Sequence, residues 1–176
     1  MNYDDTKYIF IRSFIFLGIF ILLHYTYDFF PNIVVQIFSG IDESVFQHMK
    51  IGFYSYIILL VLEFLVFKKK ITDNAKFLFS RLFSTILYPW IMFIFFFFTR
   101  VVYPIQMHFV VEIISAQATV YLSVLILGFL ELDTIKIEFG NRLKVIVLVL
   151  LILLIVEFTA FTFYLPWHDV LTDPYA

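Results

Sequence analysis

The sequence predicts an all-α fold, a polytopic transmembrane bundle of five helices, and three observations predict it. The chain is 62% hydrophobic and 15% charged, whereas a soluble domain is about half apolar and about a quarter charged. Five stretches reach the roughly 20 mostly apolar residues that a bilayer span needs. The basic residues also divide unequally between the two ends of these stretches, as is typical of multi-pass membrane proteins.

The five predicted spans form a single transmembrane domain over residues 1–176. They cover about residues 8–30, 42–67, 77–99, 103–130 and 143–164. Pro31 and Pro166 end the first and last spans, and Pro104 falls in the first turn of the fourth, where proline is tolerated. Pro89 lies inside the third span and is expected to kink it. The first apolar run extends well past the core of a signal peptide, so we expect a retained helix.

The distribution of lysine and arginine predicts the orientation. Loops alternate between the two sides of the membrane, and ten basic residues fall on one side: Lys7, Arg12, Lys68, Lys69, Lys70, Lys76, Arg81, Lys136, Arg142 and Lys144. Only Lys50 and Arg100 fall on the other. Because cytoplasmic loops collect basic residues, the N-terminus is predicted inside and the C-terminus outside. The abundance of Phe and Ile favours a bacterial cytoplasmic membrane.

Several function classes lose support from composition and motifs. The chain has no Cys, which excludes disulfides, thiolate metal sites and a cysteine nucleophile. A net charge of -2 without a basic face argues against nucleic acid as a partner. The G-x-S-x-G elbow, the H-E-x-x-H pair, the P-loop and the dinucleotide fingerprint are all missing from the sequence. Membrane lipid is therefore the expected partner. Any catalytic or binding site must be built from residues outside these known motifs.

All four histidines map to the predicted outer side, each near a carboxylate or hydroxyl. His24 and Asp28 are spaced i,i+4, as are His108 and Glu112, so each pair shares a helix face. Imidazole with carboxylate is the ligand set expected for zinc or another divalent transition metal. The candidate metal ligands are His24, Asp28, His48, His108 and His168. The alternative is that the pairs are hydrogen-bonded caps within an interfacial aromatic belt.

The candidate catalytic residues are Glu43, Glu112 and Arg100. Glu112, like Glu157, lies inside a predicted span, where an ionisable group costs about 2.5–3.5 kcal/mol and is usually retained for use. Glu43 is the candidate general base, and Ser44 is a weaker candidate nucleophile. Arg100 is placed to bind a phosphate or carboxylate of a lipid-like substrate, or else it snorkels to water.

Three further polar features have local interpretations. Asp42 is predicted to cap the second span, with Glu43 in its first turn. Glu63 is interpreted as the partner of a lysine in 68–70. A polar stripe on the fourth span favours helix–helix hydrogen bonds, with a cavity lining as the alternative, and consists of Ser115, Gln117, Thr119 and Ser123.

Three segments carry a family resemblance: HYTYDFF from His24, DESVFQHMK from Asp42 and LTDPYA from Leu171. They resemble an uncharacterised family of small bacterial multi-pass membrane proteins with an H-x-x-Y-D end to the first helix and an N-E-S-x-x-x-H-x-K start to the second. This chain departs from the pattern with Asp42 in place of Asn and Gln47 in place of Glu. A more remote similarity is to ceramidase-type membrane metallohydrolases, which gather His, Asp and Ser at one membrane face but have seven spans.

The leading hypothesis is a metal-dependent hydrolase acting on a lipid-like or peptide substrate. The histidines would hold the ion, Glu43 or Glu112 would move a proton, and Arg100 would bind the substrate anion. A small-solute or metal- or proton-coupled transporter is the second hypothesis, although Glu63 is almost the only polar group expected in the cytoplasmic half. The third is an accessory subunit that binds a membrane protein partner through its Phe-rich third span.

Overall fold

The computed structural model describes residues 3, 5–102 and 108–164, except for the side chains of Arg100 and Phe109. This part of the chain contains six α-helices and no strand: α1 Thr6–Phe29, α2 Ile33–Phe38, α3 Val45–Phe67, α4 Asn74–Val102, α5 Phe109–Thr134 and α6 Asn141–Phe163. All but the short α2 are long and apolar enough to cross a membrane. The prediction of an all-α protein with five membrane-spanning helices is confirmed.

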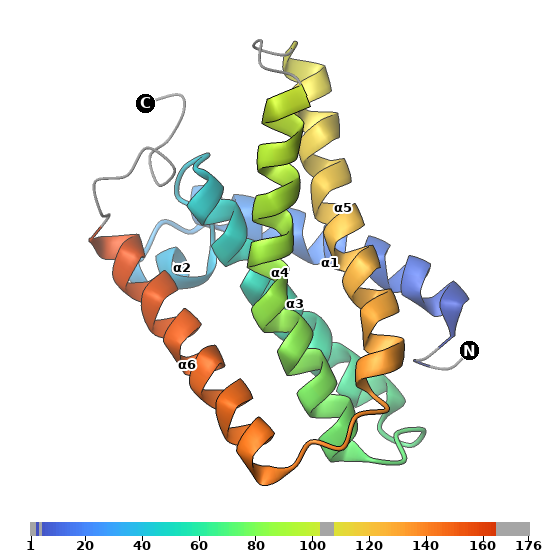
Figure 1. Ribbon diagram of the computed structural model, residues 1–176. Coiled ribbons are helices and arrows are strands. Elements are labelled where there is room, and N and C mark those ends of the chain that lie inside the picture. The colour runs from blue at the N-terminus through green and yellow to red at the C-terminus, as the bar shows by residue number, and fades with distance from the viewer. Residues whose placement is uncertain (1–2, 4, 103–107, 165–176) are drawn as a thin grey trace.

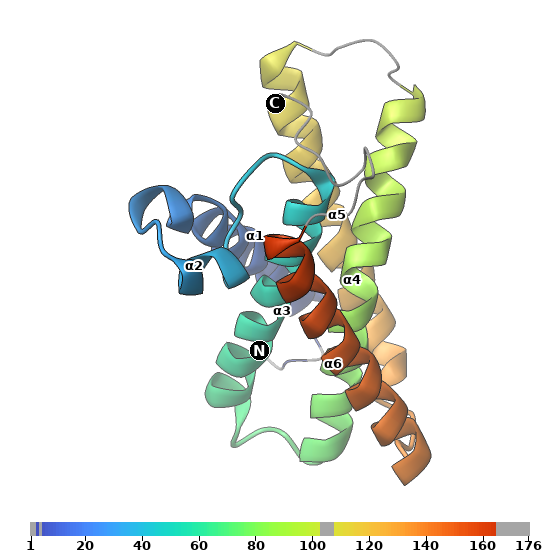
Figure 2. The same ribbon diagram turned by 90° about the vertical axis from the view of Figure 1, so that its left-hand side faces the viewer.

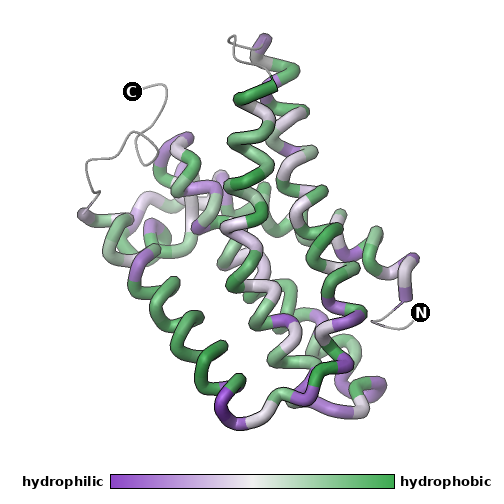
Figure 3. Tube along the Cα trace, viewed as in Figure 1, coloured by the Kyte–Doolittle hydropathy of each residue, from purple (hydrophilic) through white to green (hydrophobic). Residues whose placement is uncertain are grey.

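Helix α3 is the centre of the bundle. Within its most apolar stretch 61% of the residues are buried, against 22% for α6. Helix α3 packs against α1 and α4, which both pack against α5, while α6 lies against α4 (Figures 1 and 2). The long helices are mainly hydrophobic along their length, and hydrophilic segments gather towards their ends, as a protein surrounded by lipid requires (Figure 3).

Aromatic side chains fill the middle of this bundle. Phe16, Phe20, Tyr56 and Tyr88 are all at most 1% exposed and belong to one apolar cluster. Gly52 makes the α3–α4 contact possible, because a Cβ atom there would lie 1.9 Å from the Tyr88 ring. The absence of a side chain therefore lets the Tyr88 ring lie directly on the α3 backbone.

The connection between α1 and α3 differs from the prediction. Asn32 opens a short helix, α2, by accepting hydrogen bonds from the backbone N–H groups of Val34 and Val35, each at 3.1 Å. The N-cap of α3 is Ser44, whose Oγ accepts from Gln47 N–H at 3.2 Å. The prediction of Asp42 as the cap is wrong, because its carboxylate accepts from Ser44 N–H at 2.8 Å in a turn one step earlier.

Helices α4 and α5 also differ from the predicted spans. Helix α4 contains Pro89 and extends to Val102. Helix α5 begins at Phe109, with His108 as its N-cap. The predicted start of this span at 103, with Pro104, and the predicted stop at Pro166 lie outside the described residues.

Candidate functional site

Two histidines and one glutamate converge near the α1–α3 junction. His24 Nε2 lies 3.3 Å from His48 Nε2, and Glu43 Oε2 lies 3.5 Å from each of these nitrogens. A point equidistant from the three atoms is about 2.0 Å from each, which is the length of a zinc–nitrogen or zinc–oxygen bond. The spacing of these three atoms is therefore compatible with a divalent ion such as zinc.

His48 is oriented by its own helix. Its Nδ1 lies 2.8 Å from the carbonyl oxygen of Ser44, one turn earlier. A carbonyl only accepts, so Nδ1 carries the proton and the Nε2 lone pair faces the cluster. The ring of Phe20 stacks on His48, with centroids 6.2 Å apart and an interplanar angle of 26°. This arrangement is the usual way in which a protein orients a metal-binding histidine.

Glu43 reaches the cluster from the loop before α3. The hydrogen bond with His24 holds the pKa of the Glu43 carboxyl below its usual range, although partial burial acts in the opposite sense. The carboxylate is therefore ionised at neutral pH, as a metal ligand must be.

Hydrogen bonds to α1 and α3 hold the segment between these two helices. Ser39 Oγ accepts from Tyr27 N–H at 3.0 Å and donates to the carbonyl of Leu23 in α1. The buried Lys50 ammonium of α3 donates to Gln36 O at 2.7 Å and to Thr162 Oγ1 of α6 at 3.1 Å. These hydrogen bonds fix the loop that carries Glu43.

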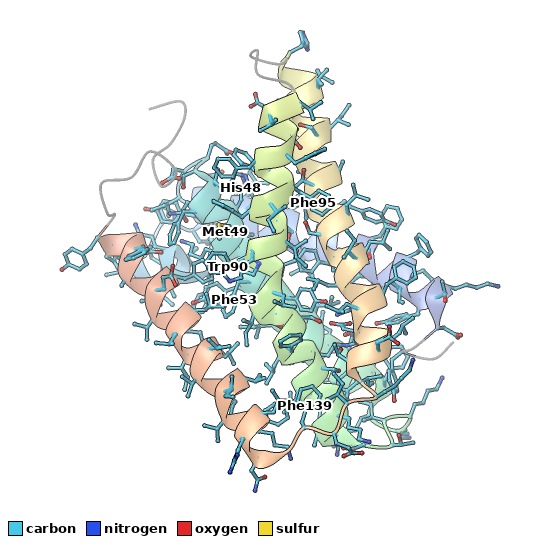
Figure 4. All side chains as sticks on the ribbon, viewed as in Figure 1. His48, Met49, Phe53, Trp90, Phe95 and Phe139 are labelled. Atoms are coloured by element: carbon cyan, nitrogen blue, oxygen red, sulfur yellow. The ribbon has the colours of Figure 1, made fainter. Side chains whose placement is uncertain are left out.

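A cavity of about 120 Å³ adjoins the cluster, and Glu43 and His48 form part of its wall. Apolar lining comes from α1, α3, α4 and α5, including Phe20 and Met92. Polar lining comes from α4 and α5: Thr99, Glu112, Ser115, Gln117 and Thr119. In Figure 4 His48 lies beside α4, at about the height of Phe95. The structure thus brings Glu43, His48 and Glu112 to one cavity.

The polar stripe of α5 has a mixed role. Ser115 and Ser123 donate to carbonyl oxygens of their own helix, Glu112 O at 2.8 Å and Thr119 O at 2.7 Å. Ser115, Gln117 and Thr119 also line the cavity. For these three, the alternative of a cavity lining is the one the structure supports.

The other predicted site residues lie elsewhere. Asp28 is exposed one turn beyond His24 and is not part of the three-residue cluster. His108 is exposed and caps α5, with Nδ1 accepting from Val110 N–H at 3.4 Å. Ser44 Oγ is buried and serves as the α3 cap. The Arg100 side chain and His168 lie outside the described residues.

A second polar cluster, which the sequence patterns did not predict, lies at the opposite end of the bundle. Arg12 of α1 lies 3.0 Å from Glu63 of α3, which also accepts from Arg81 of α4 at 3.1 Å. Glu131 of α5 pairs with both arginines. Tyr56 Oη donates to Glu131 at 2.7 Å. All five side chains are almost completely buried.

The interpretation of Glu63 as the partner of a lysine in 68–70 is wrong. Glu63 pairs instead with Arg12 and Arg81, and the group of four charged residues is called the charge cluster below. Arg12 and Arg81 were counted only as topology signals. Their position inside apolar runs, together with Glu63 and Glu131, was the available signal: two cations and two anions that could neutralise one another in lipid.

Five apolar helices, with one polar cluster buried between four of them and a second, partly exposed one at the opposite end, define an integral membrane protein of the multi-pass helical class. The chain belongs to a family of unknown function, DUF6512, whose profile covers residues 1–176. No curated protein and no solved structure matches the chain.

Proposed function

We propose that the protein is a membrane-embedded metal-dependent hydrolase, with zinc or another divalent transition metal held by His24, Glu43 and His48. The convergence of these three ligand atoms carries the proposal. Two histidines and one glutamate are an established ligand set of catalytic zinc sites, which keep a fourth position for water or substrate. A bound divalent ion makes water more acidic and polarises a carbonyl.

The residues of the chain divide the remaining tasks. Glu43 is engaged by both histidines, so we assign proton transfer to Glu112, which lines the same cavity. Phe20, Met92 and the other apolar lining residues favour a lipid-like substrate over a peptide. Arg100 remains a candidate for binding a substrate anion. By the predicted orientation the site faces the outer side of a bacterial cytoplasmic membrane.

Transport is the second candidate, and the charge cluster favours it. A path for metal or protons needs polar groups in both halves of the membrane, and Arg12, Glu63, Arg81 and Glu131 supply them in the cytoplasmic half. The buried rings of Phe16 and Tyr88 lie within the core cluster between the two ends. This apolar layer is the reason for preferring the hydrolase.

The first experiment measures bound metal in the purified protein. We expect about one zinc, iron or manganese ion per chain, and its loss in the double variant His24→Ala, His48→Ala. His108→Ala is the matched control, because it removes an outer-side histidine that lies outside the cluster. Wild-type protein that is folded and takes up no divalent metal would rule out the metalloenzyme.

The second experiment separates hydrolysis from transport. Metal-loaded protein is incubated with lipid esters and amides while released fatty acid is measured, and parallel proteoliposomes are assayed for metal or proton uptake. Release of fatty acid without uptake supports the hydrolase. Uptake without any release would replace it by the transporter.

A further inference from the structure

Two walls of the cavity beside the metal-binding cluster come from α4 and α5, and the space between these walls is called the slot below. Its α4 wall consists of Met92, Phe96 and Thr99, spaced i, i+4 and i+7, and its α5 wall extends from Glu112 to Val120. Seven residues of helix span about 10 Å. The slot therefore runs along the helix axes, and Figure 2 shows α4 and α5 diverging towards the end that carries Thr99 and Glu112.

The chemistry of the walls changes along the slot. The inner end is closed by Phe20, Met92 and Val120, each at most 3% exposed. The outer end has Glu112 and Thr99, with His48 and Glu43 at one side. An apolar pocket with a few polar groups at one end selects an amphiphile and fixes its orientation. Such an amphiphile would place its hydrocarbon chain at the inner end and its polar group beside the metal-binding cluster.

Gln117 favours a ligand whose polar group can donate a hydrogen bond. It lies on α5 between the two ends of the slot, and its Oε1 is buried with no hydrogen-bond partner among the described residues. A buried acceptor without a donor is destabilising, so a ligand that donates to it binds more tightly. A secondary amide has this donor next to a carbonyl, whereas an ester does not.

We propose that the slot binds an N-acyl amide with a single hydrocarbon chain, with the chain against Met92 and Val120 and the amide N–H donating to Gln117 Oε1. The binding mode deepens the proposed function, on which the cleavage step rests. Hydrolysis breaks the C–N bond: the hydroxyl of water joins the acyl carbon and its proton joins the nitrogen, which gives a carboxylic acid and an amine. Glu112 is the group in the slot that can carry this proton.

The test uses two probes that differ in the amide donor and one methyl group: radiolabelled N-methylhexanamide, which has an N–H, and N,N-dimethylhexanamide, which has none. Equilibrium binding is measured with the whole protein in lipid nanodiscs. We expect wild-type protein to bind the first probe about tenfold more tightly than the second. In Gln117→Leu this tenfold preference should be lost, and any small difference that remains measures the effect of the extra methyl group.

Val120→Phe fills the inner end and should abolish binding of both probes. Equal affinities in wild-type protein, or a preference that persists in Gln117→Leu, would overturn the proposal even if Val120→Phe does not fold. Metal content is measured in the same samples. If the protein binds metal but shows no preference for the N–H amide, the proposed function stands and this substrate class is rejected. If it prefers the N–H amide but binds no metal, the binding site stands and the hydrolase is rejected.

Discussion

Arg81 is the residue on which two buried carboxylates depend. It contacts Glu63 and Glu131 and is itself 3% exposed. We predict that Arg81→Met lowers the free energy of unfolding by about 3–5 kcal/mol, because it leaves two carboxylates with one arginine between them in a low-dielectric interior. Unfolding in mixed detergent micelles, followed by circular dichroism, measures this loss.

Lys76→Met is the control for that variant, since it removes a cation of the same helix whose partner Glu138 is largely exposed. An exposed ion pair contributes little, so only a small change is expected. The double variant Arg81→Met, Glu63→Gln should recover part of the loss, because it restores the balance of charge. A similar loss for Lys76→Met and Arg81→Met would contradict the importance of the buried cluster.

Glu112 is the other residue with a specific expected phenotype. If it transfers the proton, Glu112→Gln should lower the rate of hydrolysis by about 10²–10⁴-fold. Metal content should not change, because Glu112 is not one of the three clustered ligands. Ser115→Ala, one turn away on the same cavity wall, is the control and should retain most of the activity. If the Glu112→Gln variant hydrolysed substrate at the wild-type rate, a different group would have to carry the proton.

At the scale of helices, the close contact between α3 and α4 depends on Gly52, which has no side chain. Gly52→Ala places a Cβ atom 1.9 Å from Tyr88 Cε1, so the two helices must separate or the ring must move. We predict a loss of stability of about 1–3 kcal/mol. Gly18→Ala, in α1, is the matched control because nothing lies within 4 Å of its added atom. Thermal unfolding of both variants in the same detergent measures the difference.

Helices also show what the sequence could and could not predict. Apolar runs of sufficient length located all five spans, because lipid imposes one requirement on each of them. Helix α2 was missed because its six residues were too few to give a periodic signal. Spacing within one helix predicted the pair His24 and Asp28. The structure instead joins His24 to His48 across two helices and adds Glu43 from a loop.

The pairing of His24 was mispredicted because i,i+4 spacing shows which residues share a face of one helix. It does not show which faces of different helices meet. Depth in the membrane, read from topology, correctly put His24, Glu43 and His48 on one side. It did not exclude His108, which is also at that side but on α5. The charge cluster was missed for the same reason, since its four charges come from four different helices.

For the molecule as a whole, the orientation in the membrane is the property to test. The chain has no Cys, so single cysteines can be introduced without first removing native ones. We predict that an impermeant maleimide labels Asn32→Cys in intact cells, because the α1–α2 connection is exposed on the predicted outer side. Lys69→Cys should be labelled only after the cells are opened. The reverse pattern would invert the orientation and place the cluster of His24, Glu43 and His48 inside.

The charge cluster has a consequence for how the protein is made. Its members lie on α1, α3, α4 and α5, and ribosomes deliver these helices one after another. Until α5 is synthesised, Glu131 is missing and the nascent chain has two arginines of the cluster for only one of its glutamates. A charged group inside a span is costly until it is paired. The early helices should therefore remain at the insertion machinery and enter the lipid together, once the last partner has arrived.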